Sequence, residues 1–144
     1  MIFGAAGSDL LVAGGLSDTV VAGSGATTMF GGTGLALLDA GSGADLIVTG
    51  TGSAYVQAGT GAATVQAGLG ANTLVFLNGH GGGTMLVEGF EVGKDTLSLR
   101  GFGGGPQSGV ASSQAAGGGT ILTLADNTRI TLDGVASLGA ASFG

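Results

Sequence analysis

The chain has 144 residues, of which 34 are glycine, and its formal net charge at neutral pH is −6. The absence of cysteine excludes disulfides and thiolate metal sites. No lysine or arginine precedes Lys94, so the chain lacks the basic patch that binding to nucleic acid or anionic lipid requires. No apolar run approaches the roughly 18 residues of a membrane span, and the N-terminus lacks the features of a cleavable signal peptide.

Residues 3–75 consist of eight copies of a nine-residue unit, and Val75 begins a degraded ninth copy. The third and the fifth positions of the unit are each glycine in seven of the eight copies. The ninth position is always a large apolar residue: Leu11, Val20, Met29, Leu38, Ile47, Val56, Val65 and Leu74. A period this regular predicts a repeat architecture.

Each unit divides into a glycine half, which is typical of a turn, and a half that is rich in strand formers. Two units bring the chain back to its starting side, so one coil takes about eighteen residues. Stacked coils form two parallel sheets with the apolar ninth positions between them. The sequence therefore predicts an all-β fold, a parallel β-roll, or β-solenoid, of nine-residue repeats.

Residues 76–144 break this period, first in the segment NGHGGGT at 78–84. Further along, 120–124 and 128–132 alternate in polarity on either side of Ala125, Asp126 and Asn127, which predicts a β-hairpin. Because the last coil of a solenoid has an open edge, we interpret 76–144 as an irregular β cap on the 3–75 roll, within one continuous domain.

The repeats resemble the calcium-binding nonapeptide of the RTX (repeats-in-toxin) family, Gly-Gly-x-Gly-x-Asp-x-U-x. VEGFEVGKDTLSLRGF at 87–102 is similar to the segment that follows the repeats in RTX proteases, and TRITLDGVASLGAASF at 128–143 is similar to an uncleaved type I secretion region. The resemblance implies a calcium-dependent β-roll that type I export machinery delivers outside the cell or to its surface.

The aspartate that the family repeats in each nonapeptide is largely lost in this chain; we call this seventh position of successive units the aspartate column. At the seventh position of the unit, the copies carry in order Asp9, Asp18, Thr27, Ala36, Asp45, Ala54, Ala63 and Asn72. Calcium takes six to eight oxygen ligands. Neighbouring turns on one edge lie eighteen residues apart, so no two aspartates are adjacent and we expect few calcium sites.

The calcium candidates are Asp9, Asp18, Asp45, Asn72 and Asp95. We expect Asp9 and Asp18, which lie in the first coil, to bind calcium, if anywhere, across a contact with another subunit, near its Glu88, Glu91 or Asp95. The alternative is that both are solvated carboxylates that oppose aggregation.

The positions that flank the ninth position should point outward, because side chains alternate along a strand. Nine of these sixteen residues are apolar or aromatic, and Asp39 is the only charged one. Exposed apolar faces usually mark contact surfaces, although the C-terminal segment could cover one face. We predict homo-oligomeric or polymeric self-association through Leu10, Val12, Phe30, Leu46, Val48, Val21, Leu37 and Tyr55.

Three functions are compatible with these patterns, and none is enzymatic. His80, the one histidine, lies among glycines and is typical of a turn rather than a catalytic base. The leading hypothesis is a secreted structural protein that assembles into an extracellular fibre or layer. An alternative is a calcium-dependent accessory or binding module of a type I-secreted enzyme. Binding to ice or another surface is less favoured, because Thr19, Thr28, Thr64 and Thr73 form no regular double row.

Overall fold

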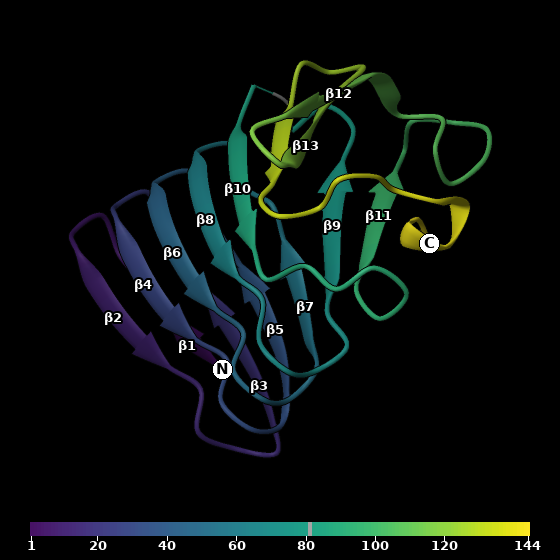
Figure 1. The fold of residues 1–144 in the computed structure, drawn as a ribbon. Coiled ribbons are helices and arrows are strands. Elements are labelled where there is room, and N and C mark those ends of the chain that lie inside the picture. Colours follow the sequence, from purple (N-terminus) through teal and green to yellow (C-terminus); the bar gives the residue numbers. More distant parts are fainter. Residues whose placement is uncertain (81) are drawn as a thin grey trace.

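A computed structural model describes residues 1–80 and 82–144. Its order is β1 (Ile2–Phe3), β2 (Asp9–Val12), β3 (Ser17–Val21), β4 (Thr27–Phe30), β5 (Leu35–Asp39), β6 (Ala44–Val48), β7 (Ala54–Gln57), β8 (Ala62–Gln66), β9 (Thr73–Leu77), β10 (Thr84–Glu88), β11 (Thr96–Arg100), β12 (Val110–Ala116), β13 (Gly119–Leu124), β14 (Arg129–Leu132) and the 3₁₀ turn η1 (Ala140–Ser142). The fold is all-β, as predicted (Figure 1).

The strands form two sheets whose members alternate along the chain. Sheet A has the order β1-β3-β5-β7-β9-β11, and sheet B has the order β12-β13-β14-β10-β8-β6-β4-β2. Within the repeats each strand pairs in parallel with the strand one coil away, so that Leu10 lies beside Thr28 and Thr28 beside Leu46. This register of eighteen residues confirms the predicted parallel β-roll of nine-residue repeats.

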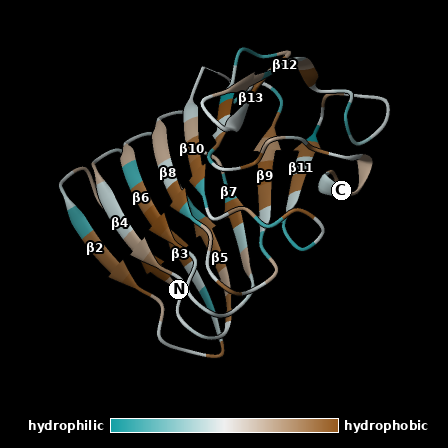
Figure 2. Ribbon diagram, viewed as in Figure 1, coloured by the Kyte–Doolittle hydropathy of each residue, from teal (hydrophilic) through white to brown (hydrophobic). Residues whose placement is uncertain are grey.

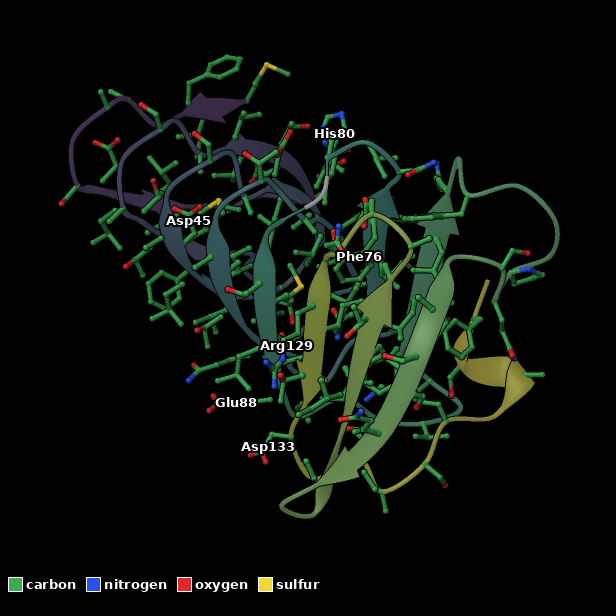
Figure 3. All side chains as sticks on the ribbon, turned by 90° about the horizontal axis from the view of Figure 1, so that it is seen from above. Asp45, Phe76, His80, Glu88, Arg129 and Asp133 are labelled. Atoms are coloured by element: carbon green, nitrogen blue, oxygen red, sulfur yellow. The ribbon has the colours of Figure 1, made fainter. Side chains whose placement is uncertain are left out.

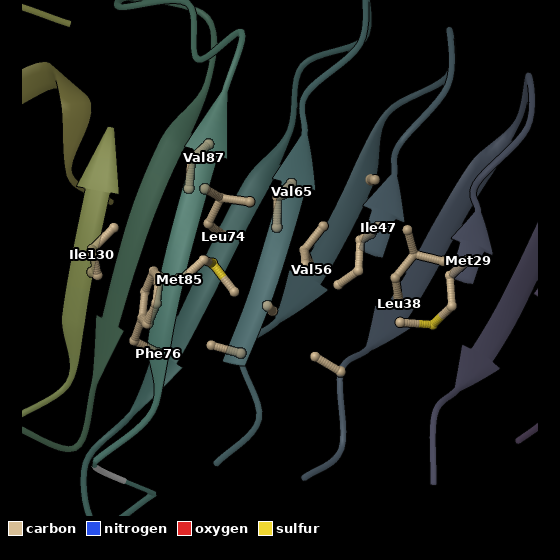
Figure 4. Close-up of a cluster of buried hydrophobic side chains, with 14 of the residues drawn as sticks. Met29, Leu38, Ile47, Val56, Val65, Leu74, Phe76, Met85, Val87 and Ile130 are labelled. Atoms are coloured by element: carbon tan, nitrogen blue, oxygen red, sulfur yellow. The ribbon is translucent and has the colours of Figure 1, made fainter. Parts of the chain in front are cut away.

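The core is a narrow layer between the two sheets. Seven of the eight ninth-position side chains are at most 1% exposed, and Leu11 at the first coil is 8% exposed (Figure 4). Small residues line this apolar centre on both sides, at the second and seventh positions: Ala13, Ala22, Ala36, Ala40, Ala54, Ala58 and Ala63. Short side chains at the two margins let the sheets approach each other where the chain turns from one sheet to the next.

The turns stack so closely that most repeat glycines have no room for a side chain. A Cβ on Gly43 would collide with the carbonyl oxygen of Gly25, and a Cβ on Gly61 would collide with that of Gly43. Neither of these two glycines has a positive φ. The glycine period therefore arises mainly from the approach of one turn to the next, and less from backbone conformations that only glycine favours.

The parallel stack continues beyond Val75, where the nine-residue period ends. Glu88 pairs with Gln66, which is 22 residues earlier, and Leu97 of β11 pairs with Leu74 of β9. Met85 and Val87 still alternate inward and are buried. The period is lost because the connecting turns become longer, while the strands keep the alternation that places them in the sheets.

The C-terminal segment adds three strands to sheet B. The predicted hairpin is confirmed, since β13 and β14 pair antiparallel and the turn places Asn127 at φ 69°. β14 also pairs in parallel with β10, and β12, which the sequence did not predict, pairs antiparallel with β13. Beside β11, Phe143 forms a bridge with Leu97, so the chain end lies against the last strand of sheet A.

Candidate functional site

The seventh-position side chains point into the roll. They lie two residues before the buried ninth position, so they share its face of the strand. Thr27 is 2% exposed, Asp45 5% and Asn72 1%. The repeat pattern predicts that this column lies in the turns, but in the structure it forms a polar margin of the core.

In the first coil, the two aspartates accept hydrogen bonds from their own turns. The Oδ2 atom of Asp9 accepts from the backbone N–H of Ala5 at 2.6 Å, and that of Asp18 accepts from the N–H of Gly15 at 2.7 Å. Each carboxylate thus satisfies a turn amide.

Asn72 connects two coils and closes its own turn. Its Oδ1 accepts from the N–H of Ala54, eighteen residues earlier, at 3.2 Å, and its Nδ2 donates to the carbonyl oxygen of Gly70 at 2.9 Å. A side-chain amide thus supplies both an acceptor and a donor at this position.

Asp45 makes the first of these two bonds but not the second. Its Oδ1 accepts from the N–H of Thr27 at 2.9 Å, whereas its buried Oδ2 has no hydrogen-bond partner among the described residues. Burial raises the pKa of the Asp45 carboxyl above its ordinary value, and the hydrogen bonds from Thr27 oppose that rise.

Asp95 belongs to the interior and not to the surface. It is 1% exposed; its Oδ1 accepts from the Asn72 backbone N–H at 2.8 Å, and its Oδ2 from the Glu91 N–H at 2.9 Å. The exposed Glu91 carboxylate pairs with Lys94 at 3.0 Å. Asp95 therefore fixes the turn between β10 and β11 against Asn72.

Of the calcium candidates, the structure brings Asn72 and Asp95 together, because the Nδ2 atom of Asn72 also donates to the Oδ1 atom of Asp95 at 3.1 Å, but this pair is not a cluster of metal ligands. Within residues 1–80 and 82–144, no three His, Cys, Asp or Glu side chains lie together in a way that could hold a metal. Each candidate instead serves a backbone amide, and Asp45 alone keeps a buried oxygen free. A ladder of sites with six to eight oxygens each does not fit these residues.

Apolar residues occur along most strands of both sheets (Figure 2), and several of those on the outer faces are exposed. Of the residues predicted to mediate self-association, five are exposed: Leu10 by 66%, Val12 by 56%, Leu37 and Tyr55 by 45% each, and Phe30 by 38%. Val21, Leu46 and Val48 are half-buried. Val75, which also flanks a ninth position, is only 7% exposed, so it offers little surface to a partner.

A groove of about 900 Å³ runs along the outer face of sheet B, across β2, β4, β6, β8, β10 and β14. Its lining includes small residues such as Ala26, Ala44 and Ala62, beside larger ones such as Leu10 and Leu46. Arg129 lies at its C-terminal end. No motif in the sequence signals this groove, because its lining comes from two or three residues of each of six strands that lie far apart along the chain.

His80 is exposed in the connection between β9 and β10, as expected of a turn residue (Figure 3). The part of the chain that the structure describes has no helix that could cross a membrane.

No protein-family model matches the chain, and no curated protein matches its sequence. Among solved structures, it is similar to the solution structure of a subunit of the mannuronan C5-epimerase from Azotobacter vinelandii. The two are 21% identical, the TM-score is 0.41, and the match covers 95% of this chain and 78% of that one. This likeness is too distant to extend to function.

Proposed function

We propose that the protein is an exported, RTX-like structural β-solenoid that associates with copies of itself into an extracellular fibre or layer, and that its turns hold few or no calcium ions. The observation that carries this proposal is the exposure of apolar side chains along the outer faces of the repeats, with Leu10, Val12 and Tyr55 among the most exposed.

These faces have the composition of a contact surface. Exposed apolar patches of this extent usually mark sites of association in soluble proteins. The outward positions of the repeats carry one charge, Asp39, whose carboxylate accepts hydrogen bonds from Gly41 N–H and from the Gln57 amide. Little charge repulsion therefore opposes the approach of a second apolar surface.

The calcium part of the proposal rests on how the turns are closed. Asn72 meets the needs of its turn with its own amide, and Ala54 and Ala63 place no carboxylate in theirs. Stacked carboxylates repel one another unless a cation lies between them, whereas stacked alanine, threonine and asparagine do not. Such a column supports a roll that stays folded without metal.

Sedimentation velocity and electron microscopy of the purified protein, with calcium and with a chelator, test this function. We expect oligomers or ordered polymers under both conditions. A triple variant, Leu10→Thr, Val12→Thr and Phe30→Thr, should shift the protein towards the monomer because it removes apolar area and keeps strand-forming residues. A wild-type protein that stays monomeric at high concentration in both buffers would contradict the proposal.

A second candidate is a calcium-dependent binding module, which the free buried oxygen of Asp45 favours. For this function, calcium must raise the melting temperature of the wild-type protein, and the Asp45→Asn variant must lose that response. Calcium titration monitored by calorimetry separates the two candidates.

A further inference from the structure

The outer face of sheet B carries three columns of side chains that cross six strands. The first outer column consists of Ser8, Ala26, Ala44, Ala62, Thr84 and Arg129. The middle outer column consists of Leu10, Thr28, Leu46, Thr64, Leu86 and Thr131. The third outer column consists of Val12, Phe30, Val48, Gln66, Glu88 and Asp133.

We propose that this face is a two-fold symmetric interface with a second copy of the chain, packed face to face about an axis that runs along the solenoid over the middle outer column. This inference rests on the proposed self-association and specifies one of its contacts, because a two-fold interface closes a dimer and a fibre or layer needs a further contact between dimers. A two-fold interface uses the same patch on both subunits, so the patch must be complementary to itself.

Side-chain size satisfies this requirement in the N-terminal half of the face. The axis exchanges the first and third outer columns, so each large residue of one copy meets a small residue of the other. Val12 lies over the partner's Ser8, Phe30 over the partner's Ala26, and Val48 over the partner's Ala44. The small first column is the floor of the groove, which leaves room for these larger side chains.

In the C-terminal half of the face, charged side chains make the patch complementary to itself. The same axis sets Arg129 opposite the partner's Asp133, and the symmetry provides this pair twice. Figure 3 shows Arg129, Glu88 and Asp133 on the same side of the molecule. Among the described residues the one ion pair joins Lys94 to Glu91, so Arg129 and Asp133 are available to a partner.

The middle outer column is also compatible with the axis. Each of its residues meets its own counterpart, which would be unfavourable for a charged side chain. Its members alternate between leucine and threonine, and none is charged. Self-contacts of this kind bury apolar area and methyl groups without bringing like charges together.

The area is sufficient for a specific contact. Six strands about 4.8 Å apart, each with about five residues at about 3.3 Å, cover about 450 Å² of flat sheet in each copy. The accessible area of side chains exceeds this projection, so the total for two copies reaches the roughly 1,000 Å² of a specific interface.

The outer face of sheet A lacks this self-complementarity. There β5 carries Leu35, Leu37 and Asp39 on its outer side. The corresponding axis would set Asp39 over the partner's Leu35 and would bury a carboxylate against an apolar side chain, which is unfavourable. The outer columns therefore favour sheet B, and not sheet A, as the two-fold interface.

A charge-exchange series tests the interface by sedimentation equilibrium of the full chain. Arg129→Asp and Asp133→Arg should each raise the dimer dissociation constant at least about tenfold, because each sets like charges opposite one another twice. The double variant restores both pairs and should return the constant to within about threefold of wild type.

A steric pair provides an independent test. Ala44→Phe fills the floor of the groove and should weaken the dimer at least about tenfold. Ala71→Phe, at the equivalent exposed position of sheet A, should leave it unchanged. Circular dichroism checks that each variant is folded.

The outcomes separate this inference from the proposed function. Wild-type protein that is monomeric throughout would overturn both. Wild-type association that is insensitive to the charge exchange and to Ala44→Phe would overturn only the interface. Weakening by each single charge variant and by Ala44→Phe, with recovery in the double variant, would support it.

Discussion

Asp45 and Asn72 show how one residue changes the hydrogen bonding of a turn. Both are buried at the seventh position, and both accept a hydrogen bond from the coil eighteen residues earlier. Asn72 then donates to the Gly70 carbonyl, whereas Asp45 has an unpartnered oxygen in its place. A buried polar atom without a partner is destabilising, and more so when it carries charge.

Replacing Asp45 by asparagine should therefore stabilise the protein at pH 7. The new amide can donate where the Oδ2 atom has no partner, which contributes about 1 kcal/mol. For a chain of this size, that corresponds to a rise in melting temperature of about 2–4 °C. Differential scanning calorimetry in the presence of a chelator measures it. Asp18→Asn is the matched control and should change stability by less than about 0.5 kcal/mol, because Asp18 is only half-buried.

The difference between Asp45→Asn and wild type should depend on pH. Burial raises the folded-state pKa of Asp45, so the folded protein binds a proton more readily than the unfolded chain. The wild-type carboxyl group therefore contributes most to the stability of the folded state at pH values below its unfolded-state pKa. This stabilisation is lost as the pH rises through the folded-state pKa. The advantage of the variant should shrink on acidification. An advantage that grows on acidification would contradict the raised pKa.

At the scale of elements, the turn stack depends on backbone contact. Gly43 lies against the carbonyl of Gly25, and Gly61 lies against that of Gly43, so each coil seats directly on the previous one. The strands are only four or five residues long in the repeats, and their pairing depends on turns that hold successive coils at the spacing of a sheet.

Gly43→Ala should consequently be strongly destabilising, by about 3 kcal/mol, because its Cβ has to displace backbone and not a flexible side chain. Gly7→Ala is the matched control: it occupies the same position of the unit, but a Cβ there meets no described atom within 4 Å. We expect a change below about 0.5 kcal/mol for it. Denaturant unfolding gives both values, and equal losses in the two variants would argue against stacking as the cause.

At the scale of the whole molecule, the fold is held by one continuous core. The buried residues run from Leu11 in the first coil through Met85 to Val135 near the C-terminal end. Hydrogen bonds of the turns are made within the chain, and the C-terminal strands extend sheet B rather than forming a separate layer. Stability should therefore depend little on bound ions.

Removal of metal should leave the folded state intact. With a chelator in place of calcium, we expect an unchanged far-ultraviolet circular dichroism spectrum and a melting temperature within about 2 °C, because a ligand stabilises a protein only in proportion to its binding. Unfolding on chelation would show that the turns require calcium despite their hydrogen bonds, and would favour the calcium-dependent binding module.

The sequence by itself determined the parallel β-roll, the inward ninth position and the C-terminal hairpin. These follow from local rules: a strand alternates, a glycine turn reverses the chain, and a strict period repeats both. Only the tertiary structure decided that Asp45, Asn72 and Asp95 serve buried backbone amides, and that the stack continues through β10 and β11. The nine-residue period predicts that residues eighteen positions apart are neighbours, but it does not predict which side chains accept from which backbone amides. The period also ends at Val75, and beyond that residue only the packing of the strands sets the register.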